Sequence, residues 1–479
     1  MAGKWKKLKN KPAFSVDTTL LLTDGTVMCH EYESPNWHKL VPDARGHYHK
    51  GTWHPITPLP ANAPITQNGP LDAPLYYAST VLKDGRVFVA GGEYNVNFNT
   101  STDLLAAEIY DPVADSWTSV ATPPGLNNIG DAPSCVLPDG RVLLGDINST
   151  NTWIFHPGTK TWTKGGVKND SSSEETWTLL PNHEVLCAEV NNHPKAEKYK
   201  ISTNKWLSAG STPAGHDLVL NVPGVSIEIG PAILMPNDRV FCTGASGHTA
   251  LYHVKTGTWS SGPDFPASGG QLMRAFDAPA CLLPNGHVLC IVGPVITSGS
   301  LTGWAGEPIK CFEFDGTALN PVSAPSGASS TVTFNCRLLL LPTGEVLYSN
   351  CTSGLEIYTP TGTPHNLWRP HITHAPKVVH RGHSYRLRGR QLNGLSQAVC
   401  YGDDAQNATN YPLIRLHHLS SKHVYFCRTF DHSTMGVATG KAVHHTHFHV
   451  PHHVPPGHYE LVVIANGISS HPVKVHVKA

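Results

Sequence analysis

The chain carries little charge, and its charges are balanced. Only 15% of its 479 residues are Asp, Glu, Lys or Arg, and 35 basic residues stand against 35 acidic ones. This composition gives no electrostatic basis for binding nucleic acid or an anionic membrane surface. No apolar stretch reaches the roughly 18 residues of a membrane-spanning helix, and no hydrophobic run follows the basic N-terminus as in a secretion signal. We therefore expect a soluble, cytoplasmic protein, or a secreted one if a signal has been removed.

Several catalytic signatures are also missing. The sequence has no His-Glu-x-x-His zinc helix, no phosphate-binding glycine loop and no Ser-His-Asp arrangement. No stretch sustains a period of 3.6 residues, which argues against a helical fold. Short alternating apolar runs are instead bounded by Gly, Pro, Asn and Asp, a pattern typical of strands joined by tight turns. The chain is expected to be nearly all β.

One pattern occurs seven times in the first 350 residues: an apolar run, a tight polar turn and a second apolar run. The turns are Asp24-Gly25, Asp84-Gly85, Asp139-Gly140, Asn182-His183, Asn237-Asp238, Asn285-Gly286 and Thr343-Gly344. Most copies continue with a third strand and a fourth that carries Trp. Successive turns lie 43 to 60 residues apart, which predicts a seven-bladed β-propeller over residues 1–369.

The seventh repeat lacks its fourth strand. The segment Lys4-Trp5-Lys6-Lys7-Leu8 matches the fourth-strand pattern at the other end of the chain. The alternative is a disordered basic tail. We favour an N-terminal strand that closes the ring, because closure removes the open sheet edges that a propeller would otherwise expose.

The eleven cysteines are an odd number, and several share one place in the repeat. The cysteines at the position five residues after the first turn residue of a repeat are Cys29, Cys187, Cys242 and Cys290. The other repeats have Val89, Leu144 and Tyr348 at this position. A position shared with aliphatic and aromatic residues indicates buried core side chains rather than ligands or disulfide partners. Reduced cysteines fit an intracellular compartment.

From about residue 370 the repeat gives way to other strands, which predict an immunoglobulin-like β-sandwich over residues 370–479. Of the 30 histidines, 17 lie in this module. On a strand, His445, His447 and His449 would point to one face, a suitable geometry for metal ligands. Exposed histidine faces more often bind metal adventitiously, and we favour that interpretation here.

A seven-bladed kelch propeller followed by a small sandwich that ends in PPGHYELVVIANG (residues 455–467) resembles the galactose oxidase and glyoxal oxidase family. The resemblance covers essentially the whole chain. It implies oxidation of an alcohol or aldehyde at a mononuclear copper held by two tyrosines and two histidines, one tyrosine being crosslinked to a cysteine. The ligand positions are therefore the test of this activity.

Those positions are substituted. The family's adjacent Tyr-His pair, just before the inner turn of the last blade, corresponds to Phe334-Asn335, and the hairpin that supplies another histidine offers Gln406. Phenylalanine has no donor atom, and a neutral amide is a poor ligand for Cu(II). The crosslinked tyrosine has no clear counterpart. We therefore expect neither copper nor copper-radical oxidation.

Polar residues should line the mouth of the propeller channel instead. Each inner strand is expected to begin near the axis, so residues six or seven places before each turn would converge there. The candidate ligand-binding residues, including nearby loop and hairpin positions, are Asp17, Tyr77, Tyr94, Asp131, Glu175 (or Glu174), Glu228, Arg274, Asp277, Asn335, Asp403, Asp404 and Gln406. Asp131, Asp277 and Asp403 are weaker candidates for metal ligands.

Converging carboxylates repel one another, which raises their pKa values unless a cation or hydrogen-bond donors offset the repulsion. Three partners are plausible. One is a hard divalent ion such as Ca²⁺, and another is a purely structural network of Arg274 and water. The third is a polyhydroxylated or cationic ligand.

Our main hypothesis is a galactose-oxidase-like propeller without the copper site that binds a glycan or small polar ligand at its axial face. Tyr77, Tyr94 and Trp304 would then stack against sugar rings. One alternative is an enzyme, a hydrolase, lyase or isomerase rather than an oxidoreductase, that uses two ring carboxylates in unlike environments. The other is a protein-interaction scaffold that uses the blade edges.

Overall fold

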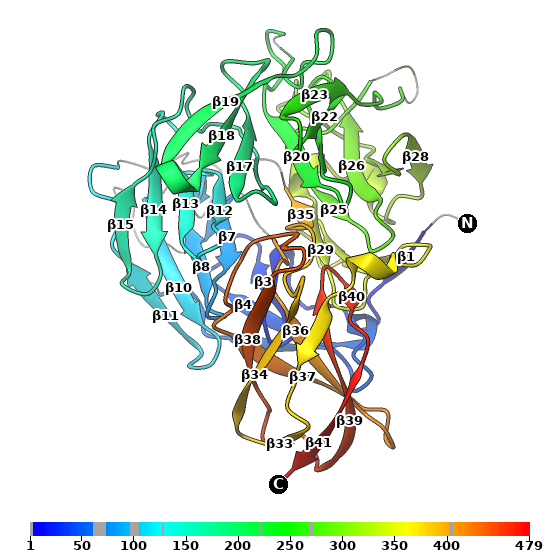
Figure 1. Cartoon of the computed structure of the whole chain (residues 1–479). Helices are drawn as coiled ribbons and strands as arrows, with labels where there is room; N and C mark the ends of the chain where they lie inside the picture. Colours follow the sequence, from blue (N-terminus) through cyan, green and yellow to red (C-terminus); the bar gives the residue numbers. More distant parts are fainter. Residues whose placement is uncertain are drawn as a thin grey trace.

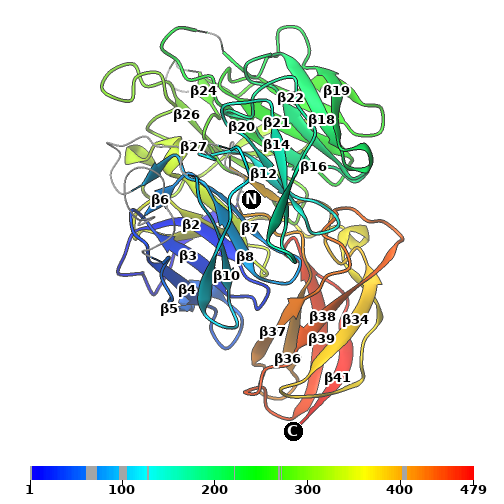
Figure 2. The ribbon, with the colours of Figure 1, turned by 90° about the vertical axis from the view of Figure 1, so that its left-hand side faces the viewer.

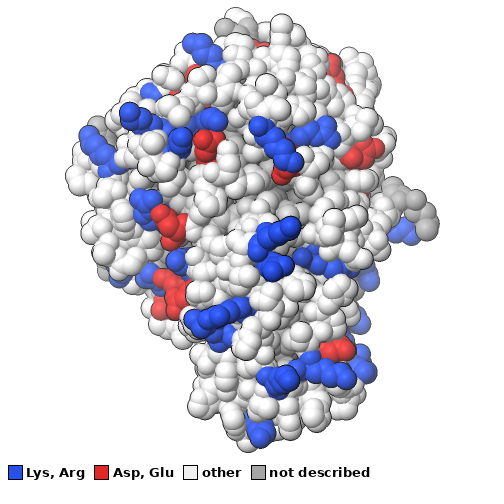
Figure 3. Space-filling view, viewed as in Figure 1, with Lys and Arg blue, Asp and Glu red and all other residues white. Residues whose placement is uncertain are grey.

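The computed structural model describes residues 3–60, 73–95, 105–126, 129–220, 222–267, 270, 272–401 and 407–479. Seven antiparallel sheets, each containing a four-stranded blade, surround one axis, and a further sheet forms the C-terminal module. Figures 1 and 2 both show this module lying against one side of the propeller. In Figure 3 acidic and basic side chains are interspersed over the propeller, whereas those on the C-terminal module below are mostly basic.

The blades are listed here from the innermost strand outward. Blade one is β2 (Val16–Leu21), β3 (Val27–Glu31), β4 (Trp37–Val41) and β5 (Thr52–Ile56); blade two is β7 (Ala78–Val81), β8 (Val87–Ala90), β10 (Ala107–Asp111) and β11 (Ser116–Val120). Blade three is β12 (Ser134–Val136), β13 (Val142–Gly145), β14 (Thr152–His156) and β15 (Thr161–Lys164); blade four is β16 (Trp177–Leu179), β17 (Glu184–Ala188), β18 (Lys195–Lys200) and β19 (Lys205–Ser211).

The remaining blades follow the same order. Blade five is β20 (Ile229–Leu234), β21 (Arg239–Gly244), β22 (Thr249–His253) and β23 (Thr258–Ser261); blade six is β25 (Ala280–Leu282), β26 (Val288–Pro294), β27 (Lys310–Phe314) and β28 (Leu319–Val322). Blade seven is β29 (Arg337–Leu340), β30 (Val346–Ser349), β31 (Glu356–Thr359) and the N-terminal β1 (Lys4–Lys7). Two short pairings lie beside the blades: β6 (Pro74–Leu75) with β9 (Tyr94–Asn95), and β24 (Met273–Arg274) with β26.

Helix is confined, in the described part of the chain, to single 3-10 turns. They are η1 (Tyr48–Lys50), η2 (Ile201–Thr203), η3 (Ala328–Ser330), η4 (Thr333–Asn335) and η5 (Asn366–Trp368). No helix among the described residues has the length and apolar character needed to cross a membrane.

The inner hairpins close as their sequences predict. In blade one the Asp24 carboxylate accepts a hydrogen bond from the Thr26 amide at 2.9 Å, the local bond that makes Asp a turn residue. Gly25 follows with a φ of +76°, which a residue with a Cβ rarely adopts. A Cβ there would also collide with the ring of Phe426 from the C-terminal module. Gly25 is therefore needed both for the turn and for docking.

In five of the seven blades, the fourth-strand tryptophan is hydrogen-bonded to the blade before it. The indole N–H donates to a backbone carbonyl at the exit of the preceding blade in Trp117 to Thr57 (2.9 Å), Trp162 to Ala121 (2.6 Å) and Trp259 to Ala209 (2.9 Å). Trp53 of blade one donates in the same way to Asn10, just after β1. The sequence motif is thus an interface between blades.

Trp5 is the copy of this tryptophan that belongs to blade seven. β1 pairs antiparallel with β31, with Trp5 opposite Tyr358. The Trp5 indole donates to the carbonyl of Ser323, at the exit of blade six, at 2.6 Å. Its ring packs against Tyr348 and Tyr358 at centroid distances of 5.6 and 4.9 Å. The N-terminal segment therefore completes the ring.

All eleven cysteines are free, and ten are buried. The four at the equivalent position, Cys29, Cys187, Cys242 and Cys290, are core residues of their blades, as the repeat indicated. Burial raises the pKa of Cys336 and of Cys135 to about 12, so both thiols stay protonated.

The C-terminal module is a curled sheet folded around its own core. Its strands are β32 (His371–His374), β33 (Val378–His380), β34 (Ser384–Arg390), β36 (Leu413–His418), β37 (Val424–Phe430), β38 (Val443–His449), β39 (Gly457–Ala465), β40 (Ile468–Ser469) and β41 (Val473–Lys478). The first half of β37 pairs with β36 and its second half with β38, so one strand joins the two layers. Leu387, Ile414 and Phe448 lie in the core between them.

This module covers the propeller face that carries the inner turns. Backbone amides three residues apart donate to carbonyls that precede the turns of three successive blades: Thr429 to Thr23 (3.1 Å), His432 to Lys83 (3.2 Å) and Met435 to Pro138 (2.8 Å). The spacing along one segment of the module thus matches the spacing of neighbouring blades.

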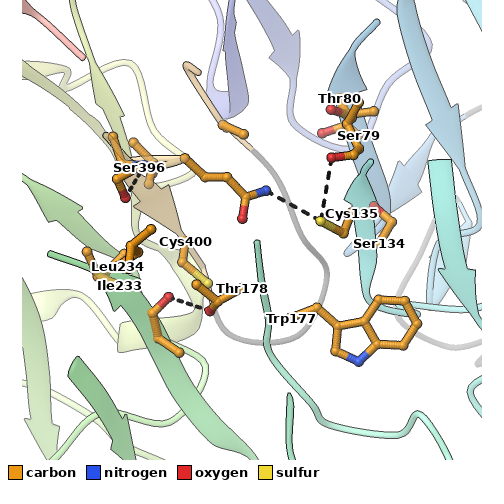
Figure 4. Close-up of a pocket in the computed structure, with 16 residues that line it drawn as sticks. Ser79, Thr80, Ser134, Cys135, Trp177, Thr178, Ile233, Leu234, Ser396 and Cys400 are labelled. Atoms are coloured by element: carbon orange, nitrogen blue, oxygen red, sulfur yellow. Dashed lines mark hydrogen bonds between the residues drawn. The ribbon is translucent and has the colours of Figure 1, made fainter. Parts of the chain in front are cut away.

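A segment of the module also enters the channel. β35 (Val399–Cys400) pairs with β25, the innermost strand of blade six, and the Gln397 side chain accepts a bond from the Leu179 amide at 2.8 Å. The space that remains is about 30 Å³, room for little more than one water. Figure 4 shows residues of four blades around it, among them Ser79, Cys135, Thr178 and Leu234. The middle of the channel is therefore filled.

In several blades the third strand has a glutamate two residues before its tyrosine. The carboxylate of this glutamate accepts a hydrogen bond from the linker that leads into the blade. Glu197 accepts from the Asn169 amide at 3.0 Å, and Glu356 accepts from the Ser326 amide at 2.8 Å. Glu108 occupies the same place in blade two and is 2% exposed, but no described residue donates to it. Burial raises its pKa to about 7.

Replacing Trp5 with alanine should lower the free energy of unfolding by about 2 kcal/mol, less than the roughly 3–5 kcal/mol of a fully buried tryptophan because Trp5 is half-buried. Lys6→Ala, an exposed neighbour in the same strand, should change it by less than about 0.5 kcal/mol. Urea unfolding of the two variants measures the difference. Equal effects would show that β1 does not hold the ring closed.

Glu108→Gln should stabilise the protein at alkaline pH. A carboxyl whose pKa rises from 4.5 to about 7 on folding favours the folded state when protonated, so stability falls as pH rises through this range. Glutamine resembles the protonated acid, and we expect a gain of about 2 kcal/mol at pH 8 and little change at pH 5. Glu356→Gln is the control, since its carboxylate is hydrogen-bonded, and it should destabilise at both values. Thermal unfolding of both variants and the wild type at pH 5 and pH 8 measures these differences.

Candidate functional site

An open pocket of about 230 Å³ lies at the mouth of the channel, where the inner strands begin. This mouth is opposite the face that the C-terminal module covers. Four carboxylates line the pocket: Glu93, Asp131, Glu228 and Asp277. The aromatic rings of Tyr76, Tyr94, Trp304, Phe334 and Tyr401 form the rest of the wall, together with Ser300 and Leu301. Acidic groups thus face apolar surfaces across a small space.

Left-handed backbone occurs at two residues that line this pocket, Tyr76 and Asp277, and at Glu174 beside it. Tyr76, Glu174 and Asp277 each lie eight residues before the first turn residue of their blade, and their φ angles are +53°, +60° and +43°. A non-glycine residue in this region costs on the order of 1–3 kcal/mol and is concentrated at functional sites in proteins. The same conformation thus recurs at equivalent positions of three blades around the mouth.

Three carboxylates from successive blades come together there. Oxygen atoms of Glu174, Glu228 and Asp277 all lie within 4.8 Å of one another. Oxygen ligands at such separations suit a hard divalent cation, because Ca²⁺ binds oxygens at about 2.3–2.6 Å on all sides. This acidic triad is the candidate ion site.

Glu175 is not part of the mouth, although the sequence favoured it over Glu174. Its side chain is buried inside blade four, where it lies 2.9 Å from Lys168 Nζ and accepts a bond from the Trp177 indole at 3.2 Å. Lys168 also lies 3.4 Å from Glu197. Glu174, in the left-handed turn before β16, has its carboxylate near Glu228 and Asp277 instead.

The same shift by one residue corrects two further predictions. Tyr77 packs in the propeller core against His30 and Trp37, at centroid distances of 5.6 and 6.3 Å, and its neighbour Tyr76 lines the pocket. Asn335 ends the turn η4 and does not line the pocket, whereas Phe334 does. Tyr401 was not anticipated at all, since it comes from the module.

Asp17 lies beneath the pocket in a buried ion pair. Its carboxylate is 3.3 Å from Arg337 and 3.7 Å from His30. Burial alone would raise the pKa of Asp17, but Arg337 and then His30 lower it below its ordinary value. The Arg337 guanidinium stacks on the Tyr401 ring at 3.9 Å and donates to the Phe334 carbonyl at 2.7 Å. The ion pair therefore supports two walls of the pocket.

The other candidates have separate positions. Tyr94, Asp131, Glu228 and Asp277 line the pocket as expected, whereas the Arg274 guanidinium is directed to the Ala245 carbonyl at 2.6 Å and is not in its lining. Asp403, Asp404 and Gln406 lie outside the described residues. The candidate metal-binding histidines on β38 are His445, His447 and His449. Their ring nitrogens are not all within 4.8 Å of one another, the separation that marks a metal-binding group among the described residues.

The pocket residues do not fit a copper site of two tyrosines and two histidines. Among the described residues its lining contains no histidine, and Phe334 in its wall has no donor atom for a metal. Burial raises the pKa of the Tyr76 and Tyr94 phenols, which disfavours the phenolate form that would bind a metal. Carboxylate oxygens suit hard ions better than Cu(II), which favours imidazole.

Comparison with known proteins agrees with this architecture. Residues 74–124 match the Kelch motif family. A segment is 34% identical over 85 residues to galactose oxidase of Gibberella zeae, and another is 27% identical over 119 residues to Kelch-like protein 30 of Homo sapiens. The solved structure of a fungal AA5-family alcohol oxidase in complex with copper aligns over 100% of both chains, with a TM-score of 0.52. The fold is a galactose-oxidase-like kelch propeller.

These similarities establish the propeller fold. The aligned segments span 12% of the galactose oxidase and 20% of the human protein, and 18% and 23% of this chain. Identity to the alcohol oxidase is 15%, a level at which the fold is shared and the chemistry depends on the residues of the site. In this galactose-oxidase-like propeller those residues are the acids and aromatics of the axial pocket.

Asp17→Asn should destabilise the protein by roughly 3 kcal/mol at pH 7, because removal of one partner leaves Arg337 as an uncompensated buried charge. A carboxyl with a lowered pKa stabilises the fold above its ordinary value of 3.8 and loses this effect as pH falls below it. The difference between variant and wild type should therefore shrink in acid.

The matched control is Asp238→Asn, which removes an exposed ion pair with Lys255 at 3.0 Å. Surface pairs are worth about 0–1 kcal/mol, so little change is expected. Chemical unfolding from pH 7 to pH 3 measures both. A constant deficit for Asp17→Asn over this range would contradict the ion pair as its cause.

Proposed function

We propose that this propeller binds a glycan or a related small polyhydroxylated ligand at the axial pocket, together with a divalent ion held by Glu174, Glu228 and Asp277. The observation that carries the proposal is the convergence of these three carboxylates within 4.8 Å, beside a pocket walled by aromatic rings. The left-handed backbone at Tyr76, Glu174 and Asp277 supports it, since strained residues are often found at functional sites.

The ion would join the protein to its ligand. Three carboxylates occupy only part of the six to eight positions around Ca²⁺, and vicinal hydroxyls of a sugar can fill others. The remaining charge of the pocket, on Glu93 and Asp131, supplies acceptors for further hydroxyl groups. A ligand rich in hydroxyl groups therefore satisfies both the ion and the walls.

The aromatic walls supply the apolar contacts. Sugar rings present C–H faces that stack on Tyr and Trp, and Tyr94 and Trp304 flank the acidic residues. The plugged channel limits the ligand to the mouth, so the pocket of about 230 Å³ would hold one or two sugar units of a longer chain, with the rest in solvent. Copper-radical oxidation has no part in the proposal. Phe334 has no donor atom, and the neutral amide of Asn335 is a poor ligand for Cu(II).

The adjacent pair Glu174 and Glu175 gives a matched test of the ion site. Glu174→Gln removes an axial carboxylate and should weaken Ca²⁺ binding by roughly tenfold or more, about 1.4 kcal/mol, in calorimetry. Glu175→Gln removes a carboxylate at the next residue, inside blade four, and should lower thermal stability while leaving Ca²⁺ affinity unchanged. Equal Ca²⁺ affinity in both variants and the wild type, or no Ca²⁺ binding at all, would contradict the acidic triad as an ion site.

Glycan arrays read with and without a chelator test the ligand. We expect binding that requires the ion and is lost in Trp304→Ala, while Trp259→Ala, at a blade interface on the outer strand, changes stability without changing the glycan profile. Ion binding without any glycan binding would refute the proposed ligand. Stoichiometric copper at the axis with peroxide formed from a sugar alcohol would refute the proposal as a whole.

A further inference from the structure

A second group of metal-ligating side chains lies outside the axial pocket, on loops of blades four and five. His216 belongs to the linker between β19 and β20, His248 to the turn between β21 and β22, and Asp264 follows β23. One ligating atom from each lies within 4.8 Å of the other two. Asp264 Oδ1 is 2.8 Å from His248 Nδ1 and 3.6 Å from His216 Nδ1. Both imidazoles thus face one carboxylate oxygen.

Backbone hydrogen bonds hold these three loops together. The Ser246 amide donates to the Leu218 carbonyl at 3.2 Å, which ties the loop of His248 to the linker of His216. The Phe265 amide donates to the Gly247 carbonyl at 3.0 Å, which ties Asp264 to the loop of His248. Leu218 and Phe265 are themselves buried, so each ligand is anchored within two residues of the core. The positions are therefore set before any ion binds.

The His216 ring contains the second observation that points to a ligand. Its Nδ1 atom is inaccessible to solvent and makes no hydrogen bond to any described residue, although 26% of the side chain is exposed. A buried polar atom without a partner costs free energy unless something binds to it. Asp264 is the nearest acceptor, and its oxygen is already engaged by His248 at the shorter distance.

A zinc ion fits the space between these atoms. Zinc binds imidazole nitrogen and carboxylate oxygen at about 2.0–2.2 Å in a tetrahedral arrangement, which places neighbouring ligand atoms roughly 3.3 Å apart. The two observed separations, 2.8 and 3.6 Å, lie on either side of that value, so small rotations of the side chains would suffice. Two nitrogens and one oxygen also suit zinc better than Ca²⁺, which takes oxygen ligands.

We propose that His216, His248 and Asp264 form a zinc site, with water at the fourth position. Asp264 is half-exposed, which gives the ion a path from solvent. The ion would fasten the linker that enters blade five to two loops of that blade. The same linker continues to Glu228 of the axial triad, and its Ser226 amide donates to the Gly303 carbonyl beside Trp304 at 3.1 Å. Zinc would thus stabilise one side of the axial pocket from a distance, without touching its ligand.

Zinc titration of chelator-stripped protein tests the site. Wild type should bind one zinc ion more tightly than all others, and its melting temperature should rise with zinc by mass action. His216→Ala with His248→Ala should weaken that ion about a hundredfold or more, and Asp264→Asn roughly tenfold, since each removes a direct ligand. Equal melting temperatures of variants and wild type in chelator show that the variants are folded. Co²⁺ in place of zinc should give tetrahedral absorption bands only where the site is intact.

The matched control is His445→Ala with His449→Ala, which removes two partly exposed histidines from β38 and should leave the tight ion in place. Loss of the tight ion in this control, with its retention in the His216 and His248 variant, would assign the binding to adventitious histidines and overturn the proposal. So would a wild type without any tight zinc ion. Glu174→Gln should keep the zinc site, so the axial proposal and this one can fail independently.

Discussion

The interaction that recurs most around the ring is the hydrogen bond from a fourth-strand tryptophan to the backbone of the preceding blade, which five of the seven blades make. A propeller has no sheet that crosses its axis, so neighbouring blades must hold each other, and the last must meet the first. Trp117, Trp162 and Trp259 make this bond between consecutive blades, and Trp5 makes it from the other end of the chain. Because β1 also pairs with β31, this one strand covers the open sheet edge of blade seven and joins blade seven to blade six.

The two faces of the closed ring differ: one is covered by the C-terminal module, and the other has an open pocket. The C-terminal module docks on the inner turns through amides spaced to match the blades, and its β35 segment fills the channel. The opposite mouth stays open, and it is lined by carboxylates and by residues with left-handed backbone, Tyr76 and Asp277. Conformational strain of this kind persists only where the surrounding structure is rigid enough to impose it, and a closed ring with a filled channel meets that requirement. The packing of the module on one face thus helps to hold the strained backbone at the mouth on the other face.

The propeller shares its architecture with an alcohol oxidase solved with copper, yet the donors at its axis are carboxylates and neutral phenols. A fold fixes where the residues of an axial site stand, and the residue types decide what binds there. The Asp17 and Arg337 pair shows how such a mouth is supported: a buried charge pair under the floor holds Tyr401 and the Phe334 backbone in place. The acidic triad lies beside this supported wall and offers carboxylate oxygens.

The sequence by itself determined the blades, their number, the closing strand and the buried cysteines, because turn residues, strand alternation and the repeated tryptophan are local signals that recur at regular spacing. It did not determine which of two neighbours faces the axis. Tyr76 rather than Tyr77, and Glu174 rather than Glu175, point to the mouth because a left-handed residue precedes the strand, and a shift of one residue reverses every side chain. Tyr401 reached the pocket, and His216, His248 and Asp264 reached one another, only through tertiary structure. Their separations along the chain follow loop lengths and docking rather than any short motif, so only the packing of the blades decides them.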